Sequence, residues 1–426
     1  MLKIPKLREL SFLVYGLGLS GRSTVNFFKK KNIKNFSVWD DNRKHLFKSL
    51  RAKDLRQTLD NVDFIVLAPG ISLNKNKILN KFKDKIITDI DLFFLINKNC
   101  KSIVVTGTNG KSTTCKLIEH LLKKNKYKCR LGGNIGTPIL NLKNFNNSYV
   151  IIEASSFQLS HSKFIRPNYA FFINITNDHL DWHGSKKNYL SSKLKIFGLQ
   201  GKNHFAIIPK SIKRIFKIKK FLSKPIINEH VKYNKRIKLK IKNGYLSSKI
   251  NDENMSFVYS FSKLLKIKEK NFISAMQSFS GLPHRFEIFL KKRGIIFIND
   301  SKATTFEATQ SALTSLKNIY WIVGGQPKNG DKIKFSNFKK NIIKCYIIGH
   351  DISFFKKQIK GKLDFLITKN LKNSICQILK DIKFQNNEKK SILLSPSAAS
   401  FDQFENFEER GNEFKRLCKK YARKLN

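Results

Sequence analysis

The sequence is poor in acidic residues and has no long apolar runs or paired cysteine motifs. Its 426 residues include 30 Asp and Glu against 83 Lys and Arg, for a formal net charge of +53. No run approaches the roughly 18 consecutive apolar residues that a membrane-spanning helix needs, so we expect no membrane span. The six cysteines are Cys100, Cys115, Cys129, Cys345, Cys376 and Cys418. None forms a CxxC pair, which argues against a disulfide or metal framework and indicates reduced thiols in a cytoplasmic protein.

The start of the chain also lacks the features of a secretory signal. Residues Met1–Leu10 are basic, but they have neither a long apolar core nor a small-residue cleavage site. Elsewhere the composition is ordinary, with 41% hydrophobic and 27% charged residues, which excludes a largely disordered chain. At about 100–200 residues per domain, the length predicts roughly two to four domains.

The positive charge has two interpretations. A nucleic-acid or anionic-surface binder would gather its lysines on one face. Here the lysines are spread through all regions together with abundant Ile, Asn and Phe, which favours a bias of composition. We therefore expect no specific nucleic-acid partner. Residues 210–250 alternate Lys with apolar residues, as in Lys235–Lys242. This pattern predicts strands with one solvent-exposed face, and an RNA-binding strip is the alternative.

Strand and helix patterns alternate along the chain, which predicts an α/β protein built from parallel βαβ units. In the first part, strands are predicted at Ser11–Tyr15, Asn35–Asp40 and Phe64–Ala68, with a helix ending at Lys30. In the second they are predicted at Ser102–Val105, Tyr149–Glu153 and Ala170–Ile175. In the third they are predicted at Gly294–Asn299, Tyr320–Val323, Cys345–Ile348 and Ile392–Leu394, before a helix at Phe407–Leu425. We place the domains at 1–91, 92–281 and 282–426.

A glycine-rich turn follows the first predicted strand. Gly16, Gly18 and Gly21 are spaced as G-x-G-x-x-G, and Asp40 lies 19 residues after Gly21, at the end of the next strand. Glycines let the backbone approach a phosphate at a helix N-terminus, and a carboxylate at that place commonly meets a ribose hydroxyl. The pattern predicts a nucleotide site, with a plain tight turn as the alternative.

A second loop gives a stronger phosphate-binding pattern. Thr106–Thr113 reads TGTNGKST between a strand and a helix, where backbone N–H groups and the positive helix end can cradle phosphates. We expect Lys111 to reach the outer phosphates, and Ser112 or Thr113 to hold Mg²⁺. The spacing departs from G-x-x-x-x-G-K-[ST] because position 105 is Val. The alternative is an ordinary helix N-terminus.

A bound nucleotide with its phosphates would need a metal. Glu153 ends a predicted buried strand, and His179 lies in the segment Asn174–Asp181. Oxygen ligands suit Mg²⁺, and a neutral His can add a ligand. Without the phosphate loop, the structural interpretation of both residues would be preferred.

These motifs occur in an order that resembles the Mur ligase family, of which folylpolyglutamate synthetase is a distant relative. The shared landmarks are Thr106–Thr113, Gly133–Gly136, Glu153–Gln158, Asp178–Asp181, and Lys193 after Tyr189. Further motifs resemble the D-glutamate-adding members: Gly16–Gly21, Ala68–Ile71, Gly281–Glu287, Asn299–Thr304 and Ser395–Phe404. The resemblance runs from about residue 11 to the C-terminus.

The resemblance implies three domains: an N-terminal Rossmann-like domain for UDP, a central P-loop ATPase-like domain and a C-terminal Rossmann-like domain. It implies a monomeric cytoplasmic ligase of peptidoglycan precursor synthesis. Such an enzyme joins UDP-N-acetylmuramoyl-L-alanine and D-glutamate through an acyl phosphate, and ATP is converted to ADP and phosphate. The implied cofactors are ATP and Mg²⁺, with two ions expected.

The resemblance also implies roles for individual residues. The UDP-substrate set is Leu19, Ser20, Asp40, Gly70, Asn134, Ser155, Gln158 and His179. The ATP set is Gly107, Thr108, Asn109, Gly110, Lys111, Ser112, Thr113, Asn251, Asn254, Arg285 and Asp300. The metal set is Ser112, Thr113, Glu153, His179 and Lys193 as a carbamate, and the D-glutamate set is Lys302, Thr304, Ser400, Phe401 and Phe407. The catalytic set is Lys111, His179, Lys193, Arg285 and Lys302.

Some positions depart from the family pattern. Trp182 stands where many relatives have Arg, and Asp40-Asp41-Asn42 lacks a Thr-Arg pair after the acidic residue. The surroundings of Asn251 and Asn254 are also unusual. A ligase for another amino acid, folylpolyglutamate synthetase and a non-catalytic relative remain alternatives. The Asp-Asn-Pro-Arg string expected of a diaminopimelate-adding enzyme is absent.

Overall fold

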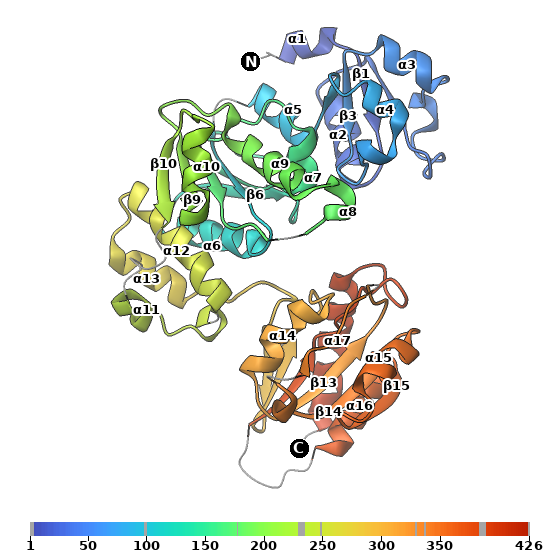
Figure 1. The fold of residues 1–426 in the computed structure, drawn as a ribbon, viewed down its shortest axis with the longest axis vertical. Helices are drawn as coiled ribbons and strands as arrows, with labels where there is room; N and C mark the ends of the chain where they lie inside the picture. Colours follow the sequence, from blue (N-terminus) through green and yellow to red (C-terminus); the bar gives the residue numbers. More distant parts are fainter. Residues whose placement is uncertain are drawn as a thin grey trace. The chain divides into compact units, whose positions relative to one another are not determined.

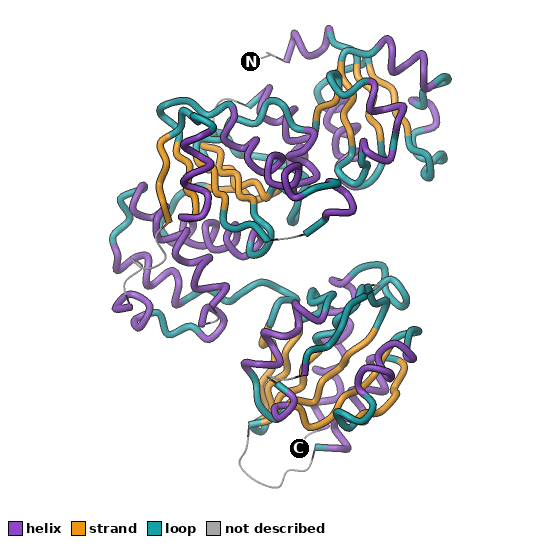
Figure 2. Tube along the Cα trace, in the orientation of Figure 1, coloured by secondary structure: helices purple, strands orange, loops and turns teal. Residues whose placement is uncertain are grey.

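The computed structural model describes residues 4–97, 100–176, 178–228, 235–247, 249–328, 330–335, 338–382 and 389–424. The chain divides into two compact units, Met1–Phe279 and Ser280–Asn426. Among the described residues the strands form three sheets, of four, six and six strands, and helices flank each sheet (Figures 1 and 2). The first unit holds two sheets and the second unit holds the third. The α/β fold expected from the sequence is confirmed.

The first sheet has the strand order β2-β1-β3-β4, with all neighbours parallel. Its strands are β1 (Phe12–Tyr15), β2 (Phe36–Trp39), β3 (Phe64–Leu67) and β4 (Ile86–Ile87). Its helices are α1 (Ile4–Glu9), α2 (Leu19–Lys30), α3 (Leu55–Asn61), α4 (Lys77–Lys81) and α5 (Asp89–Ile96). Every residue of β1 is buried: Phe12 and Val14 pack in one core, Leu13 and Tyr15 in another. Apolar runs without alternation are typical of parallel sheets covered on both faces.

The second sheet has the order β10-β9-β8-β5-β7-β6 and is also parallel throughout. Its strands are β5 (Lys101–Thr106), β6 (Cys129–Gly133), β7 (Tyr149–Glu153), β8 (Tyr169–Phe172), β9 (Phe205–Pro209) and β10 (Lys224–Asn228). The helices of this part are α6 (Lys111–Lys124), α7 (Ser156–His161), α8 (Leu180–His183), α9 (Lys186–Gly198), α10 (Lys213–Ile218), α11 (Lys235–Lys240), α12 (Lys249–Leu264) and α13 (Glu269–Gln277). The loops after β5, β7 and β8 therefore meet at one edge.

Helix α5 joins the first two sheets. Asp91 is fully buried, and its carboxylate accepts the backbone N–H groups of Lys163 at 3.0 Å and Phe164 at 2.7 Å. Burial raises the pKa of Asp91 to about 6, against the hydrogen bonds that favour the carboxylate. The boundary predicted after residue 91 falls inside this helix. The three domain ranges remain a prediction.

The third sheet, in the second unit, has the order β11-β12-β16-β13-β14-β15. Its strands are β11 (Glu287–Lys292), β12 (Ile295–Asn299), β13 (Ile319–Gly324), β14 (Ile342–Ile348), β15 (Phe365–Lys369) and β16 (Lys390–Leu394). Its helices are α14 (Phe306–Ser315), α15 (Ile352–Ile359), α16 (Leu371–Asp381) and α17 (Phe407–Tyr421). Only the β11–β12 pair is antiparallel among the described strands. The predicted C-terminal helix ends earlier than expected, at Tyr421, and Leu425 lies outside the described residues.

The expectation of a strand at Lys235–Lys242 is wrong, because residues 235–240 form helix α11. The apolar residues there alternate with lysines, but only two of them are buried. Ile237 and Ile241, four residues apart, are 2% and 8% exposed, whereas Leu239 between them is 76% exposed. A spacing of four places residues on one face of a helix, so the relevant period is helical.

Within the described residues, no helix is both long enough and apolar enough to cross a membrane.

The first βα turn makes a stability prediction possible. A Cβ added to Gly21 would collide with the carbonyl oxygen of Gly16, whereas a Cβ on Gly18 would meet nothing within 4 Å. We expect Gly21→Ala to destabilise the protein by about 1–3 kcal/mol, because overpacking outweighs the gain in helix propensity. Urea unfolding of both variants measures this difference, with Gly18→Ala as the matched control. A Gly21→Ala protein as stable as wild type would contradict this packing.

Candidate active site

The loop between β5 and α6 is shaped by a close contact with helix α12. Gly110 has φ +83°, a left-handed conformation that favours glycine, and a Cβ there would collide with the side chain of Asn254. Asn254 is 1% exposed, and its Oδ1 accepts a hydrogen bond from Thr114 Oγ1 at 3.3 Å. One of the two amides predicted for the ATP set therefore packs on the phosphate loop. The other, Asn251, donates to the carbonyl of Tyr245 at 2.7 Å.

A side chain from the neighbouring strand braces the same loop. Asn174 follows β8, and its Oδ1 accepts the backbone N–H groups of Thr108 and Asn109, each at 3.0 Å. Its Nδ2 donates back to the carbonyl of Asn109 at 3.0 Å. The sequence analysis gave Asn174 no role, although its place at the end of a strand beside the loop could have indicated one.

Two lysines meet at one carbonyl oxygen of the loop. Lys111 Nζ donates to Gly107 O at 3.0 Å and Thr108 O at 2.8 Å, and Lys193 Nζ donates to Gly107 O at 2.7 Å. Lys193 is only 1% exposed, and burial, together with the charge of Lys111, lowers its pKa to about 6. Tyr189, one helical turn earlier on α9, places its hydroxyl 3.0 Å from Thr108 Oγ1. The structure thus brings together the lysines predicted for phosphate and for metal binding.

Glu153 supplies a buried carboxylate beside this loop. It ends β7 and is 2% exposed, and its Oε1 accepts a hydrogen bond from Asn134 Nδ2 at 2.8 Å. Its Oε2 has no hydrogen-bond partner among the described residues. The pKa of the Cys115 thiol on α6 is raised well above its usual value by burial and by Glu153, with Lys111 opposing. Glu153 and Lys111 therefore act electrostatically on the same helix, and the unpartnered oxygen fits a cation ligand.

The rest of the predicted metal set is more dispersed. Ser112 and Thr113 lie nearly buried in the first turn of α6. His179 Nε2 lies 3.3 Å from Asp178 Oδ2, and its ring centre is 4.7 Å from that of Phe157. The described residues contain no group of three or more His, Cys, Asp or Glu that could hold a metal. A metal here would depend on Glu153, on hydroxyl groups and on a modified Lys193, and the part of His179 stays a prediction.

Ser155 and Gln158 form a capping box at the start of α7. Gln158 N donates to Ser155 Oγ at 3.2 Å, and Ser155 Oγ donates to Gln158 Oε1 at 3.1 Å. Gln158 Nε2 lies 3.5 Å from the carboxylate of Asp89 on α5, which Ser20 also contacts. Burial raises the pKa of Asp89, while these hydrogen bonds oppose the shift. Ser20 and Gln158, predicted to contact one substrate, are thus joined through one buried carboxylate.

Trp182, which stands where many relatives have Arg, is a packing residue at the junction of the two sheets. Its ring centre lies 4.7 Å from that of Phe157 and 5.4 Å from that of His161. Its carbonyl accepts hydrogen bonds from Ser72 Oγ at 3.3 Å and Asn74 Nδ2 at 3.2 Å. The departure from the family pattern replaces a cation with an aromatic ring that packs within the second part of the chain, while the backbone carbonyl of Trp182 makes the hydrogen bonds to the first part.

A pocket of about 390 Å³ opens at the carboxyl ends of β1, β2 and β3. Its lining residues are Tyr15, Gly16, Gly18, Leu19, Ser20, Asp40, Asp41, Asn42, Arg43, Ala68, Pro69, Gly70 and Ile71. Four of the residues predicted to hold UDP, namely Leu19, Ser20, Asp40 and Gly70, are among them. In doubly wound sheets a ligand binds outside the carboxyl ends of the strands, where the strand order reverses, and this pocket has that place.

Asp40 holds the walls of this pocket in place. Its carboxylate accepts the backbone N–H groups of Leu17 at 2.6 Å, Arg43 at 2.7 Å and Asn42 at 2.9 Å. Burial favours the neutral acid, but these donors and the Arg43 charge outweigh it and hold the pKa of Asp40 below its usual value. Arg43 Nη1 lies 3.8 Å from Asp40 Oδ2. Arg43, which no sequence motif indicated, is a cation in the pocket near the position of the absent Thr-Arg pair.

In the second unit, Asp300 follows β12 and is buried, with 8% of its surface exposed. Its Oδ1 accepts the backbone N–H of Phe286 at 3.0 Å, and its Oδ2 accepts Ser395 Oγ at 2.8 Å. Burial raises its pKa to about 7, against these hydrogen bonds and the nearby charge of Arg285. The structure therefore brings Asp300 and Arg285, both predicted for the ATP set, into electrostatic contact.

The predicted D-glutamate residues come from three segments at the carboxyl edge of the third sheet. Lys302 Nζ lies 3.7 Å from the centre of the Phe407 ring, within the range of a cation–π contact. Ser400 is buried, Thr304 is half-buried, and Phe401 is 70% exposed. The structure brings Lys302 and Phe407 together directly.

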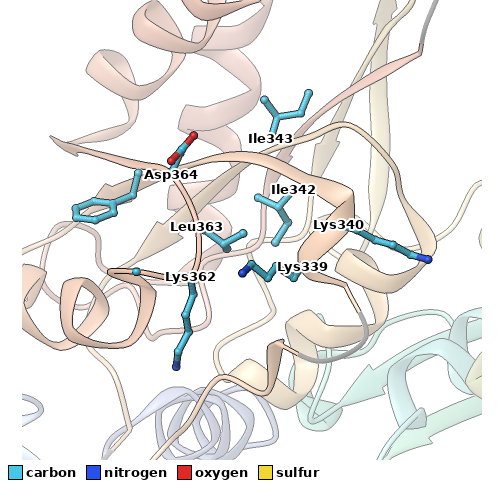
Figure 3. Close-up of a pocket in the computed structure, with 9 residues that line it drawn as sticks. Lys339, Lys340, Ile342, Ile343, Lys362, Leu363 and Asp364 are labelled. Carbon is cyan, nitrogen blue, oxygen red and sulfur yellow. The ribbon is translucent and has the colours of Figure 1, made fainter.

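A larger pocket, of about 1190 Å³, lies elsewhere in the second unit. Figure 3 shows Lys339, Lys340 and Lys362 around it, near Ile342 and Leu363. These residues lie at the amino ends of β14 and β15, and none of them belongs to a predicted set. Because ligands of parallel sheets bind at the carboxyl ends of strands, we place the candidate site at that opposite edge.

Comparison with known proteins decides the family. Residues 105–277 match the model of the Mur ligase middle domain. The UDP-N-acetylmuramoylalanine–D-glutamate ligase of Rickettsia prowazekii is 36% identical over 436 residues, which cover 96% of this chain and 97% of the relative. The ligase of the same name from Buchnera aphidicola is 37% identical over 438 residues, covering 96% and 97%. This chain belongs to the Mur ligase family.

Solved Mur ligases share the fold at much lower identity. The MurF ligase of Thermotoga maritima, solved in complex with ADP, is 16% identical, covers 99% of this chain and 98% of its own, and gives a TM-score of 0.56. The UDP-N-acetylmuramate-alanine ligase of Thermotoga maritima gives 17% identity, 97% and 100% coverage, and a TM-score of 0.54. The predicted family and its fold are confirmed, and the roles of individual residues stay predictions.

The enclosed Asp300 predicts a dependence of Mur ligase stability on pH. Its pKa rises from 3.8 to about 7 on folding, so its contribution is full below about pH 4 and is lost as the pH rises towards 7. The loss amounts to at most about 1.4 kcal/mol for each pH unit in that interval. Asp300→Asn should remove this dependence, because an amide can keep both hydrogen bonds without titrating. Urea unfolding from pH 4 to 8 measures it.

The exposed Asp364 of the same unit provides the control. Asp364→Asn should follow the pH profile of the wild type. Parallel profiles for wild type and Asp300→Asn would rule out a titrating Asp300.

Proposed function

We propose that this protein is an ATP-dependent amide ligase that adds D-glutamate to UDP-N-acetylmuramoyl-L-alanine, a peptidoglycan precursor, and releases ADP and phosphate. One observation carries the proposal. A phosphate loop, with Lys111 and the buried Lys193 on one carbonyl oxygen, lies in a chain that is 36–37% identical along nearly its whole length to ligases of that name.

The first step follows from the poor reactivity of a carboxylate as an acyl donor. The carboxylate of the L-alanyl end attacks the γ-phosphorus of ATP, the bond to the ADP oxygen breaks, and an acyl phosphate forms. The backbone N–H groups of the loop and the ammonium group of Lys111 offset the charge on the transferred phosphoryl group. Asn254 and Asn174 contribute by holding the loop in this shape.

The second step forms the amide. The D-glutamate nitrogen attacks the acyl carbon, the tetrahedral intermediate loses phosphate, and the amine proton passes to a base or solvent. Lys302 and the hydroxyls of Thr304 and Ser400 suit a dicarboxylate, because a cation and hydroxyl donors can hold its two negative groups. In this proposal these residues of the second unit orient the amine, and the ATP roles of Arg285 and Asp300 stay as predicted from the family resemblance.

Mg²⁺ is part of the proposal, with two ions expected. The unpartnered Oε2 of buried Glu153 fits a cation ligand. Ser112, Thr113, Glu153, His179 and a carbamylated Lys193 would hold the metal, which would offset charge on the phosphate oxygens when bound. The protein residues position the phosphates and exclude water from the acyl phosphate.

The surroundings of Lys193 support its modification. Only a neutral amine can attack CO₂, and burial lowers the pKa of Lys193 to about 6, so the neutral form prevails at pH 7. The amine nitrogen bonds to the carbon of CO₂ and loses a proton to solvent, so carbamate formation replaces a neutral amine with an anion beside Lys111. The remaining N–H can still donate to Gly107 O, which accepts from Lys193 in the structure.

We also propose that the enzyme acts as a monomer in the cytoplasm, where ATP is available and its six free thiols stay reduced. The domain ranges 1–91, 92–281 and 282–426 and the absence of a specific nucleic-acid partner complete the proposal.

Phosphate release from Mg-ATP tests the function. The assay contains UDP-N-acetylmuramoyl-L-alanine and, in turn, D-glutamate, L-glutamate, L-lysine or diaminopimelate. We expect release that requires both the UDP-peptide and D-glutamate. Lys111→Ala should lose turnover at least about 100-fold, because charge stabilisation at the phosphoryl group is lost, while still binding the UDP-peptide.

Release with another amine would move this ligase to a different step of the pathway. No release with any amine, from folded protein, would favour a non-catalytic relative or the nucleic-acid interpretation. Undiminished turnover by Lys111→Ala would contradict the assignment of the phosphate loop.

Chemical rescue tests the carbamate. We expect Lys193→Ala to lose activity by about 100-fold or more and to regain part of it with added short carboxylic acids, because the acid can replace the missing anion. Lys187→Ala is the matched control, since Lys187 is exposed on the same helix and should change nothing. Full activity of Lys193→Ala without additive would remove Lys193 from the site, and activity that no acid restores would count against the carbamate.

A further inference from the structure

Arg410 is a buried arginine on α17 with no role in the mechanism above. Its side chain is 1% exposed. Its Nε donates to Ser301 Oγ at 3.0 Å, and its Nη2 donates to Ser301 O at 2.9 Å and to Ala398 O at 3.0 Å. One guanidinium group thus joins the segment after β12 to the segment after β16.

These two segments carry most of the predicted D-glutamate residues. Ser301 directly precedes Lys302, and Ala398 lies two residues before Ser400. Ser301 Oγ also donates to the carbonyl of Phe407 at 2.9 Å, at the start of the helix that bears Arg410. Arg410 is therefore bonded, directly or through Ser301, to all three segments from which the amino-acid site is built.

The buried surroundings of Arg410 make its charged form energetically unfavourable. Among the described residues it forms no ion pair within 4 Å, and its Nη1 has no hydrogen-bond partner. Burial lowers its pKa to about 10, with only the charge of Asp402 opposing. A buried charge without a close partner is poor evidence for a stabilising role. The planar fork of the guanidinium does fix the relative positions of three oxygen atoms, which a lysine cannot do.

We propose that Arg410 is the positioning residue of the amine site: it sets the distance between the Lys302 segment and the Ser400 segment without touching the substrate. The inference rests on the proposed function, and it adds a residue to which neither the sequence motifs nor the family resemblance gave a role. Lys302 Nζ lies 3.7 Å from the centre of the Phe407 ring, and the hydrogen bonds of Arg410 and Ser301 fix the two segments that form this contact.

A misplaced amine would have a specific chemical consequence. The acyl phosphate forms before the amine reacts, so water can compete for it. Water oxygen then attacks the acyl carbon, the bond to the phosphate oxygen breaks, and the carboxylate and phosphate are released with no amide. The ratio of phosphate released to amide formed therefore reports on amine positioning, and a smaller fraction of folded enzyme leaves this ratio unchanged.

The experiment compares wild type, Arg410→Lys and Ser301→Ala in the full chain. Arg416→Met is the control, because Arg416 lies on the same helix but is exposed and paired with Glu413 at 2.6 Å. For each protein, phosphate and amide are measured against D-glutamate concentration at saturating Mg-ATP and UDP-N-acetylmuramoyl-L-alanine. KM values for these two substrates and thermal unfolding are measured alongside.

We expect Arg410→Lys to raise the KM for D-glutamate about 10- to 100-fold and to raise the phosphate-to-amide ratio above one. The KM values for ATP and the UDP-peptide should stay within about twofold of wild type. Ser301→Ala, which removes one acceptor and leaves the arginine in place, should shift the same two quantities less. Arg416→Met should match wild type.

The inference is overturned if folded Arg410→Lys keeps the wild-type ratio and KM for D-glutamate, or if kcat alone falls in proportion to lost folded protein. If Arg410→Lys does not fold, Ser301→Ala decides by the same ratio, and an unchanged ratio overturns the inference. A wild type that forms no D-glutamate amide would overturn the proposed function itself. If wild type and the variants all release one phosphate for each amide formed, only the role of Arg410 is overturned.

Discussion

The hydrogen bonds to the carbonyl oxygen of Gly107 organise the candidate site. Lys111 is the first residue of α6 and Lys193 lies on α9, so one acceptor binds two amines from separate helices at the place where phosphates are expected. Two like charges at this distance in a buried site repel, and the repulsion is relieved when one amine is neutral. Burial, reinforced by the charge of Lys111, lowers the pKa of Lys193 to about 6 and so favours its neutral form. The neutral form of Lys193 is the one that the proposed carbamate requires.

Parallel sheets explain why these groups meet at all. In each of the three sheets the predicted residues follow the carboxyl ends of neighbouring strands, as Asp40 follows β2, Glu153 ends β7 and Asp300 follows β12. Loops at that edge begin from buried strands, so the hydrogen-bonded ladder brings side chains that are distant in sequence to neighbouring positions. The larger pocket of the second unit lies at the opposite edge, and its size alone gives it no part in the chemistry.

Local motifs were enough to predict the family and to select loops that the structure places at the carboxyl edges of the sheets. The glycine turn and the TGTNGKST loop could be predicted from sequence because phosphate binding by such loops depends on backbone shape. Glycine and the loop sequence determine that shape over a few residues. The prediction of a strand at Lys235–Lys242 was wrong. An alternation of lysine and apolar residues is also compatible with a helix in which only every fourth residue is buried. Asn174 and Arg410 were missed because each acts on a segment distant in sequence, and only the fold brings such pairs together.

Two residues to which the sequence motifs gave no role share a physical character. Asp89 and Arg410 are buried ionisable groups, and each bonds two segments that carry predicted substrate contacts. Burying such groups opposes their charged forms, so packing alone would favour apolar residues at these positions. What an apolar residue cannot do is hold two loops at a fixed spacing through directed hydrogen bonds. A ligase that must present an amine to an acyl phosphate before water reaches it depends on that spacing, and the energetic cost of these buried groups is consistent with that need.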